Sequence, residues 1–224
     1  EHQLKALEKS WAQKTYALFM EMGTGKSKVL VDNIAMLYDR GAIRGVLIVA
    51  PKGVYKNWHD IEIPVHLPDH IEHTKVMWEA TTTKKKQNEL DTLFDDKNDL
   101  KILIMNVEAF STPKGLDFAE RFLNIFLGKA LLGIDESTTI KNPTAKRTKN
   151  ILKLGNLASY RRILTGSPVT KSPLDLYSQC EFLDPYHLGH QSYYSFRARY
   201  ANMVKRNFGG RQVQFVTSYR RLDE

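Results

Sequence analysis

The sequence has few cysteines and no long apolar runs, and each absence excludes a class of protein. Cys180 is the single cysteine among 224 residues, so no disulfide can form within the chain. No apolar run approaches the ~20 residues that a helix needs to cross a bilayer. The first residues also lack the charged segment and apolar core of a secretory signal. We therefore expect an intracellular protein without membrane contact.

Internal repeats and low-complexity tracts are absent too, and 224 residues suffice for one large domain with a buried core. Lys and Arg number 33 against 25 Asp and Glu, which gives a formal charge of +8. An excess of positive charge favours an anionic partner such as a nucleic acid, although a merely basic surface explains the charge equally well.

Continuous apolar runs recur along the chain, and helical patterns separate them. Unbroken rather than alternating runs indicate strands that are buried on both faces of a parallel sheet. Apolar residues at helical spacing over 27–39 and 84–96 predict crossover helices. We therefore predict an α/β fold, a mostly parallel sheet with helices on both faces and right-handed crossovers. The expected strands are 16–20, 45–50, 75–80, 101–107, 130–136 and 160–166.

Two segments fall outside this pattern. Residues 64–74 carry two prolines and three histidines, which is typical of a surface loop. Metal binding by His66, His70 and His73 fits their spacing, but a solvated loop explains the same residues without ligand geometry. Residues 186–224 are aromatic and basic, and we predict that they form an extension from a lobe of residues 1–185. The chain begins at Glu1 without a methionine, and we interpret it as part of a longer protein.

A glycine loop between a predicted strand and a predicted helix indicates a phosphate site. The general motif G-x-x-x-x-G-K-[ST] lacks its first glycine here, because Met20 occupies that position. Gly23 and Gly25 nevertheless precede Lys26 and Ser27. Backbone N–H groups in such a loop bind phosphate, the lysine reaches the β and γ phosphates, and the serine hydroxyl can ligate Mg²⁺. A plain glycine turn is the alternative.

A carboxylate pair completes this site. Asp135 and Glu136 directly follow an apolar run, which places them at the carboxyl edge of the sheet, where ligands bind in α/β folds. We expect Asp135 to hold magnesium together with Ser27, and Glu136 to activate the attacking water. An exposed acidic strand end would look the same in isolation.

The ordered series of motifs resembles the first motor lobe of superfamily 2 helicases, and most closely the Swi/Snf-type DNA translocases. The matching segments are "HQ" (2–3), "MEMGTGKS" (20–27), "APKGVYKNW" (50–58), "IMNVEAF" (104–110), "DESTTIKNPTAKRTK" (135–149) and "LTGSPVTKSPLDLYSQCEFLDP" (164–185). The sequence departs from the family at Ser137, Thr138 and Ser167, where the family has alanine, histidine or glutamine, and threonine.

This resemblance implies a RecA-like P-loop NTPase lobe that uses ATP and Mg²⁺ and acts on DNA, in duplex form. It implies three sets of residues besides the catalytic Lys26, Asp135 and Glu136. The nucleotide set is Gln3, at the adenine, with Gly23, Thr24, Gly25, Lys26, Ser27 and Lys28; the coupling set is Thr165, Gly166 and Ser167; the nucleic-acid set is Lys52, Ser111, Thr112, Lys141 and Asn142.

The resemblance also implies a second RecA-like lobe in the full-length chain, which would supply the arginine finger. Arg161 and Arg162 lie on a strand of this lobe and are not expected to serve as that finger. The alternatives are an RNA-directed helicase, a P-loop kinase or transport ATPase that acts without nucleic acid, and a non-catalytic DNA-binding module. We expect Trp58 to pack into the core, and Cys180 to be buried and inert.

Overall fold

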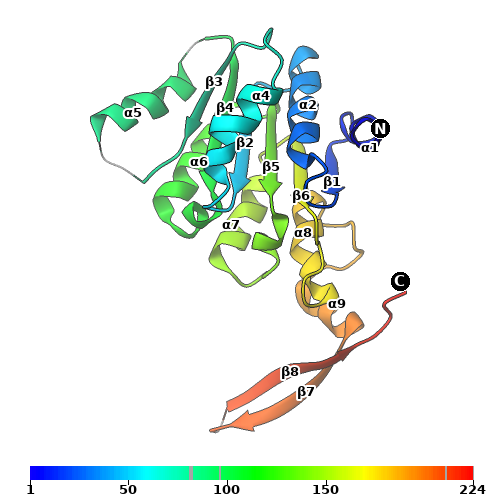
Figure 1. The fold of residues 1–224 in the computed structure, drawn as a ribbon. Coiled ribbons are helices and arrows are strands. Elements are labelled where there is room, and N and C mark those ends of the chain that lie inside the picture. Colours follow the sequence, from blue (N-terminus) through cyan, green and yellow to red (C-terminus); the bar gives the residue numbers. More distant parts are fainter. Residues whose placement is uncertain (81–82, 96, 210, 224) are drawn as a thin grey trace.

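Six parallel strands form one sheet in the order β1-β6-β5-β2-β4-β3 (Figure 1). The computed structural model describes residues 1–80, 83–95, 97–209 and 211–223. Each strand overlaps one of the six predicted runs, so the predicted α/β class is confirmed. The strands are β1 (Thr15–Phe19), β2 (Gly45–Ala50), β3 (His73–Met77), β4 (Leu100–Asn106), β5 (Ala130–Asp135) and β6 (Tyr160–Thr165).

Helices cover both faces of this sheet and create two hydrophobic layers. Leu30, Ile34 and Trp58 belong to the layer under α2 and α4, whereas Phe122 and Ile151 belong to the layer under α6, α7 and α8. Strands β2 and β5 are buried at every residue because both of their faces are covered. The helices of the lobe are α1 (His2–Ser10), α2 (Lys26–Asp39), α3 (Tyr55–Asn57), α4 (Ile63–His66), α5 (Lys84–Asp91), α6 (Pro113–Ile125), α7 (Lys146–Gly155) and α8 (Leu176–Leu183).

The predicted surface loop over 64–74 is wrong at both ends, because α4 extends to His66 and β3 begins at His73. A π-helical turn, η1 (Trp58–Glu62), runs directly into α4, and the helix ends only at His66. Pro64 is compatible with this because it lies just after the π-helical turn, where the regular α-helical hydrogen bonding is already interrupted. The predicted helix over 84–96 consists of α5 and a 3₁₀ turn, η2 (Thr92–Phe94), and residue 96 lies outside the described residues.

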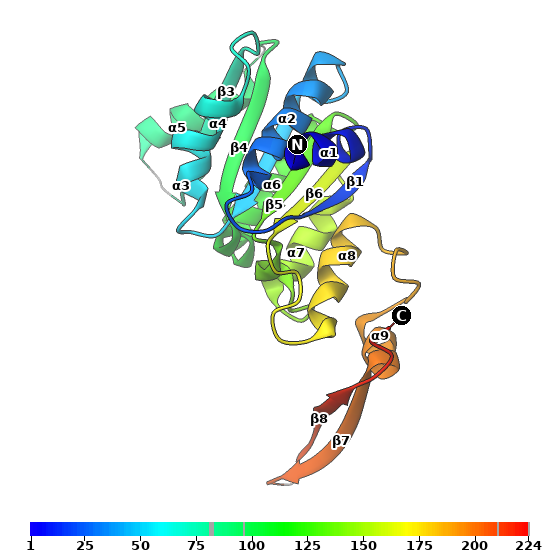
Figure 2. The same ribbon diagram turned by 45° about the vertical axis from the view of Figure 1, so that its right-hand side comes forward.

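The chain after Pro185 leaves the sheet and forms α9 (Tyr193–Tyr200) and an antiparallel hairpin of β7 (Ala201–Phe208) and β8 (Arg211–Tyr219). Figures 1 and 2 show the hairpin projecting away from the sheet. Buried Phe196 and Ala201 pack on Leu174 and Tyr177 and thereby anchor its base to the lobe. Across the described parts of the chain, no helix has both the length and the apolarity of a membrane span.

Candidate functional site

The phosphate loop lies between β1 and α2, and two glycines in left-handed conformations shape it. Gly23 has φ +78° and Gly25 has φ +84°, values that residues with a Cβ rarely adopt. A Cβ at Gly25 would also lie 2.2 Å from Gln3 Nε2. Glycine at this position therefore permits both the turn of the loop and the close approach of α1, which carries Gln3.

Two polar side chains donate to the backbone of the phosphate loop. Lys26 is only 9% exposed, and its Nζ donates to the Glu21 carbonyl at 3.1 Å. Gln3 Nε2 donates to the Thr24 carbonyl at 3.0 Å. Lys28 instead turns to Asp32, with an ion pair of 2.7 Å one helical turn along α2. The polar groups of Lys26 and Gln3 thus converge on one short loop.

Asp135 is the last residue of β5, and a tryptophan at the start of η1 orients its carboxylate. Trp58 is fully buried, as predicted, and its Nε1 donates to Asp135 Oδ2 at 2.8 Å. The backbone N–H of Glu136 donates to Oδ1 at 3.0 Å. Burial raises the pKa of Asp135 above its usual value, and the Trp58 hydrogen bond opposes that rise because it favours the ionised form. The negative charge of Glu136 raises the pKa further.

Glu136 has φ +47°, a left-handed conformation that is uncommon for a non-glycine residue and costs it energy. This turn starts the chain into η4 (Ser137–Ile140). Thr165 Oγ1, at the end of β6, lies 3.5 Å from Glu136 Oε2, at the outer limit of a hydrogen bond. Thr165, one of the three residues expected to couple hydrolysis to movement, thus makes a long contact with the acidic pair.

Gly166 packs the loop after β6 against the phosphate loop. A Cβ on Gly166 would meet the Met22 nitrogen at 3.3 Å and the Met20 oxygen at 3.4 Å. The backbone also connects the two loops, since the Met20 N–H donates to the Thr165 carbonyl at 3.3 Å. The exposed Ser167 donates its N–H to Thr165 Oγ1.

One groove of about 350 Å³ joins the phosphate loop to the acidic pair. Sequence reasoning missed two of its polar residues, Glu62 and His66, which approach each other to 3.6 Å. His66 reaches the groove because the first part of the segment expected to be a loop is helical, and Glu62 lies one turn earlier at the end of η1. The lining residues are Gly23, Gly25, Lys26, Ser27, Lys28, Val54, Glu62, His66, Asp135 and Glu136. A serine hydroxyl and a carboxylate at one groove are ligands that suit Mg²⁺, so Ser27 and Asp135 fit that ion.

The sequence also did not reveal a hydrogen-bond chain that joins Ser137, the residue after the acidic pair, to the loop after β6 through Gln179 on α8. Ser137 and Gln179 are both fully buried, and the Ser137 hydroxyl donates to Gln179 Oε1 at 2.6 Å. Gln179 Nε2 in turn donates at 2.8 Å to the carbonyls of Pro168 and Asp175. The serine that departs from the family's alanine thus has a specific partner on α8.

The residues proposed for nucleic-acid contact follow β2, β4 and β5, so they lie at the same edge of the sheet as the phosphate loop. Lys52 and Asn142 are exposed. Thr112 caps α6, because its Oγ1 accepts from the Gly115 N–H at 3.2 Å, and Ser111 precedes it. Lys141 lies 3.5 Å from the Asp175 carboxylate and also donates to the Thr170 hydroxyl.

The three histidines and the cysteine singled out in the sequence lie apart from this groove or from one another. His66 faces Glu62, His70 pairs with Asp39 at 3.0 Å, and His73 meets the Ile71 carbonyl, so the three histidines do not converge on one point. Cys180 is half-buried rather than fully buried, and this burial raises the pKa of its thiol to about 11. At that pKa the thiolate is scarce at neutral pH, as expected for an unreactive cysteine.

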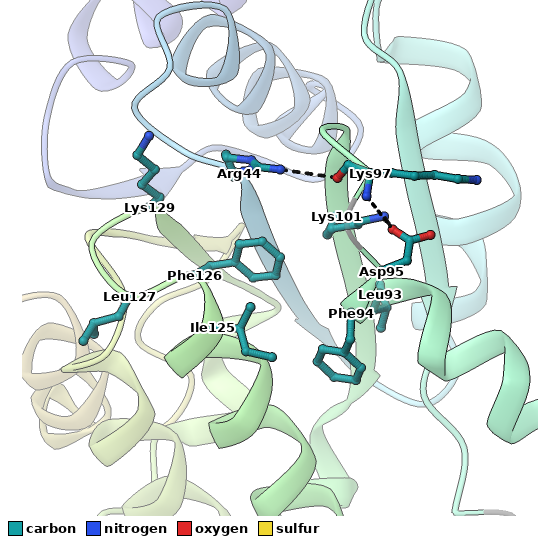
Figure 3. A pocket seen from close by; sticks show the side chains of 10 residues that line it. All are labelled: Arg44, Leu93, Phe94, Asp95, Lys97, Lys101, Ile125, Phe126, Leu127 and Lys129. Carbon is teal, nitrogen blue, oxygen red and sulfur yellow. Dashed lines mark hydrogen bonds and ion pairs between the residues drawn. The ribbon is translucent and has the colours of Figure 1, made fainter.

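A further cavity, of about 440 Å³, lies at the opposite edge of the sheet (Figure 3). Its polar residues Arg44, Lys101 and Lys129 stand at the amino ends of β2, β4 and β5. The Arg44 guanidinium donates to the Lys97 carbonyl at 3.3 Å, and Lys101 pairs with Asp95 and Asp99. Ligands of α/β folds bind at the carboxyl edge instead, where the smaller groove lies.

A parallel sheet with a phosphate loop after β1 and a carboxylate pair after β5 defines the RecA-like class of P-loop NTPases. Within that class the chain belongs to the SNF2-related domain family, whose model matches residues 2–214. The fold is similar to the Sulfolobus solfataricus SWI2/SNF2 ATPase core in complex with dsDNA, with a TM-score of 0.68 and 22% identity over 89% of this chain and 38% of that chain. The resemblance to Swi/Snf-type proteins is therefore confirmed.

Two Arabidopsis thaliana proteins are also similar. Protein CHROMATIN REMODELING 24 is 25% identical over 214 residues, which make up 92% of this chain and 19% of that protein. "Probable ATP-dependent DNA helicase CHR12" is 31% identical over 175 residues, or 74% of this chain and 14% of that protein. The chain thus spans less than a fifth of the length of these relatives.

Proposed function

We propose that this chain is the ATP-binding lobe of a motor that moves along duplex DNA. The observation that carries the proposal is the single groove in which Lys26, Ser27, Asp135 and Glu136 meet. A phosphate site opposite a carboxylate pair is the arrangement that P-loop NTPases need for hydrolysis. The family and the double-stranded DNA in the complex of the Sulfolobus protein support DNA as the track.

Each residue of the groove has a role in this proposal. Lys26 would leave the Glu21 carbonyl and bind the β and γ phosphates, while the N–H groups of Gly23, Thr24 and Gly25 hold the remaining oxygens. Ser27 and Asp135 would hold Mg²⁺, which neutralises charge on the phosphates when bound. Glu136 would take a proton from the attacking water. Gln3 would contact the adenine edge, and Lys28 borders the groove beside them.

Coupling to DNA would involve the two loops that pack on each other. Thr165 contacts Glu136, and Gly166 packs against the phosphate loop. Lysines, hydroxyls and amides suit contacts to the phosphate backbone, which a motor that ignores sequence requires. We propose these contacts for Lys52, Ser111, Thr112, Lys141 and Asn142.

In the same proposal, residues 1–185 form the ATP-binding lobe and residues 186–224 form an extension toward a second RecA-like lobe. That lobe would supply the arginine finger, because Arg162 is fully buried beneath α1 and cannot reach the groove. We expect the 224 residues alone to bind ATP weakly and hydrolyse it slowly. The lone half-buried cysteine and the family support an intracellular location.

The test is the ATPase activity of the complete protein, titrated in parallel with duplex DNA, single-stranded DNA and RNA. Stimulation by duplex DNA above the other two supports the proposal, whereas stimulation by RNA alone favours an RNA-directed helicase. An ATPase rate that none of the three nucleic acids changes would indicate a P-loop NTPase that acts without nucleic acid. Lys26→Ala should abolish hydrolysis, and Lys84→Ala, at the exposed start of α5, is the matched control.

A further inference from the structure

The hairpin of β7 and β8 has two chemically different faces. Residues paired across an antiparallel ladder place their side chains on the same face. Lys205 pairs with Gln214 and Asn207 pairs with Gln212, and all four residues are exposed. We call this the amide face. The opposite face carries Arg206 and the apolar residues Val204, Val213 and Phe215.

The hairpin is also depleted of acidic residues. Residues 185–222 contain no aspartate or glutamate. The same segment contains seven Lys and Arg residues, namely Arg197, Arg199, Lys205, Arg206, Arg211, Arg220 and Arg221. A projecting element with this composition has a positive potential along its length and attracts polyanions.

A groove connects the amide face to the lobe. Val216, which shares that face because it pairs with Met203, lines a groove of about 310 Å³ together with Lys141 and Asn142. Arg197 on α9 donates to Gln214 Oε1 at 3.2 Å and links the helix to the same face. The remaining lining residues are Pro143, Ser172, Leu174, Asp175, Tyr193 and Tyr219.

The one carboxylate of this groove already has partners. Asp175 accepts from the N–H groups of Thr170 and Lys171 and lies 3.5 Å from Lys141 Nζ. Burial raises its pKa, but these hydrogen bonds outweigh burial, so the pKa of Asp175 stays below its usual value. Its charge is therefore satisfied locally. Cations and amides lie at the two ends of the path from the lobe to the hairpin, Lys141 and Asn142 on the lobe and Lys205 and Gln214 on the hairpin, with Val216 between them.

We propose that the amide face is a second DNA-binding surface that continues the one at Lys141 and Asn142. The inference rests on the proposed function and extends it to the amide face, that is, to Lys205, Asn207, Gln212 and Gln214. Amides and lysines contact phosphates and sugars without reading sequence. From Val216 to Gln212 a strand rises about 13 Å, which corresponds to about 4 base pairs of duplex DNA. The hairpin would thus lengthen the footprint of the lobe by about that amount.

Lys205 and Arg206 are consecutive in β7 and lie on opposite faces of the hairpin, so they provide a matched test. Duplex DNA binding by the complete protein is measured against salt concentration. Lys205→Ala should weaken binding several-fold and reduce the slope of log K against log salt by about 0.9, the value of one phosphate contact. Arg206→Ala removes the same charge from the opposite face and should leave the slope unchanged.

A second variant separates hydrogen bonding from charge. Asn207→Ala combined with Gln212→Ala should weaken binding several-fold but keep the slope, since no counterion release is lost. Equal effects of Lys205→Ala and Arg206→Ala, or no effect of any variant, would overturn the inference and leave the proposed function intact. Absence of DNA binding by the parent protein would overturn both.

Discussion

Trp58 donates its indole N–H to Asp135 Oδ2 at 2.8 Å, across 77 residues of sequence. Both side chains are buried, and the bond fixes the carboxylate that we propose for magnesium. A hydrogen bond to a carboxylate favours its charged form, so Trp58 keeps Asp135 more acidic than burial alone would allow. A residue of the turn after β2 thereby tunes the chemistry at the end of β5.

Trp58→Phe should raise the pKa of Asp135 further. The folded-state pKa already lies above the usual value, so the ionised form that Mg²⁺ requires is lost as the pH falls through it. Without the indole N–H, Asp135 should lose its charge at a higher pH than in the parent protein. We expect magnesium–nucleotide affinity at neutral pH to fall roughly tenfold, since a hydrogen bond to a charged group contributes about 1.5–3 kcal/mol.

The measurement is nucleotide affinity against pH, with and without Mg²⁺. Trp78→Phe is the matched control, because it changes a buried tryptophan in the other hydrophobic layer. A pH profile for Trp58→Phe that coincides with that of Trp78→Phe would contradict a role for the indole in setting the carboxylate's pKa.

Gln3 offers a prediction on base selectivity. Gln3→Ala should weaken ATP binding about fivefold, the equivalent of one ordinary hydrogen bond, and leave GTP binding unchanged. His2→Ala is the control, since His2 Nε2 also lies near the Thr24 carbonyl, at 2.9 Å, and tests support of the loop alone. Equal losses for both nucleotides in Gln3→Ala would show that Gln3 only supports the loop. Titration calorimetry with each nucleotide measures this.

Elements that depend on local pattern could be predicted from the sequence. Unbroken apolar runs predicted the central strands β2 and β5 most clearly, because a strand in the middle of a parallel sheet is buried on both faces. The glycine loop and the acidic pair were predictable because their chemistry lies within a few residues. Their meeting at one groove also followed, since parallel strands share a carboxyl edge.

Contacts between distant positions could not be predicted in this way. Ser137 and Gln179 are 42 residues apart, and no local period shows which buried polar groups will pair. His66 was not placed at the groove because prolines and histidines dominate residues 64–74 and mask a helix end, and Glu62 lies just before that segment. The hairpin strands are exposed on both faces, so they lack the apolar run that reveals a buried strand.

Arg162 is the basis of a prediction on stability. Its guanidinium is fully buried and donates to the carbonyls of Ser10 and Gln13, each at 2.8 Å, and to Asn33 at 3.1 Å. Burial lowers its pKa to about 10. Arg162→Met leaves these acceptors unsatisfied, and we expect the free energy of unfolding to fall by at least ~3 kcal/mol.

Urea denaturation measures that change, and Arg161→Met on the same strand is the control. Arg161 is half-buried and donates to the Phe182 carbonyl, so its loss should cost ~1 kcal/mol. Because Arg162 holds the end of α1, its substitution should also weaken ATP binding through Gln3. Equal costs for the two arginines would contradict this role.

The pair of Ser137 and Gln179 makes the last prediction, which concerns non-additivity. Gln179→Leu leaves the Ser137 hydroxyl buried without its acceptor, and Ser137→Ala leaves Gln179 Oε1 without its donor. Each variant should lower the free energy of unfolding by about 1–3 kcal/mol. The double variant removes both polar partners, so its cost should fall below the sum of the two by at least ~1 kcal/mol.

Ser178→Ala is the matched control for this cycle. Ser178 is as buried as Ser137, but among the described residues its hydroxyl has no hydrogen-bond partner, so its removal should be nearly neutral. Strictly additive costs for Ser137→Ala and Gln179→Leu in urea denaturation would mean that the 2.6 Å contact contributes no coupling energy. A coupling of the expected size would instead show that this chain tethers its acidic turn to the Pro168 loop with hydrogen bonds, at a position where its family has alanine.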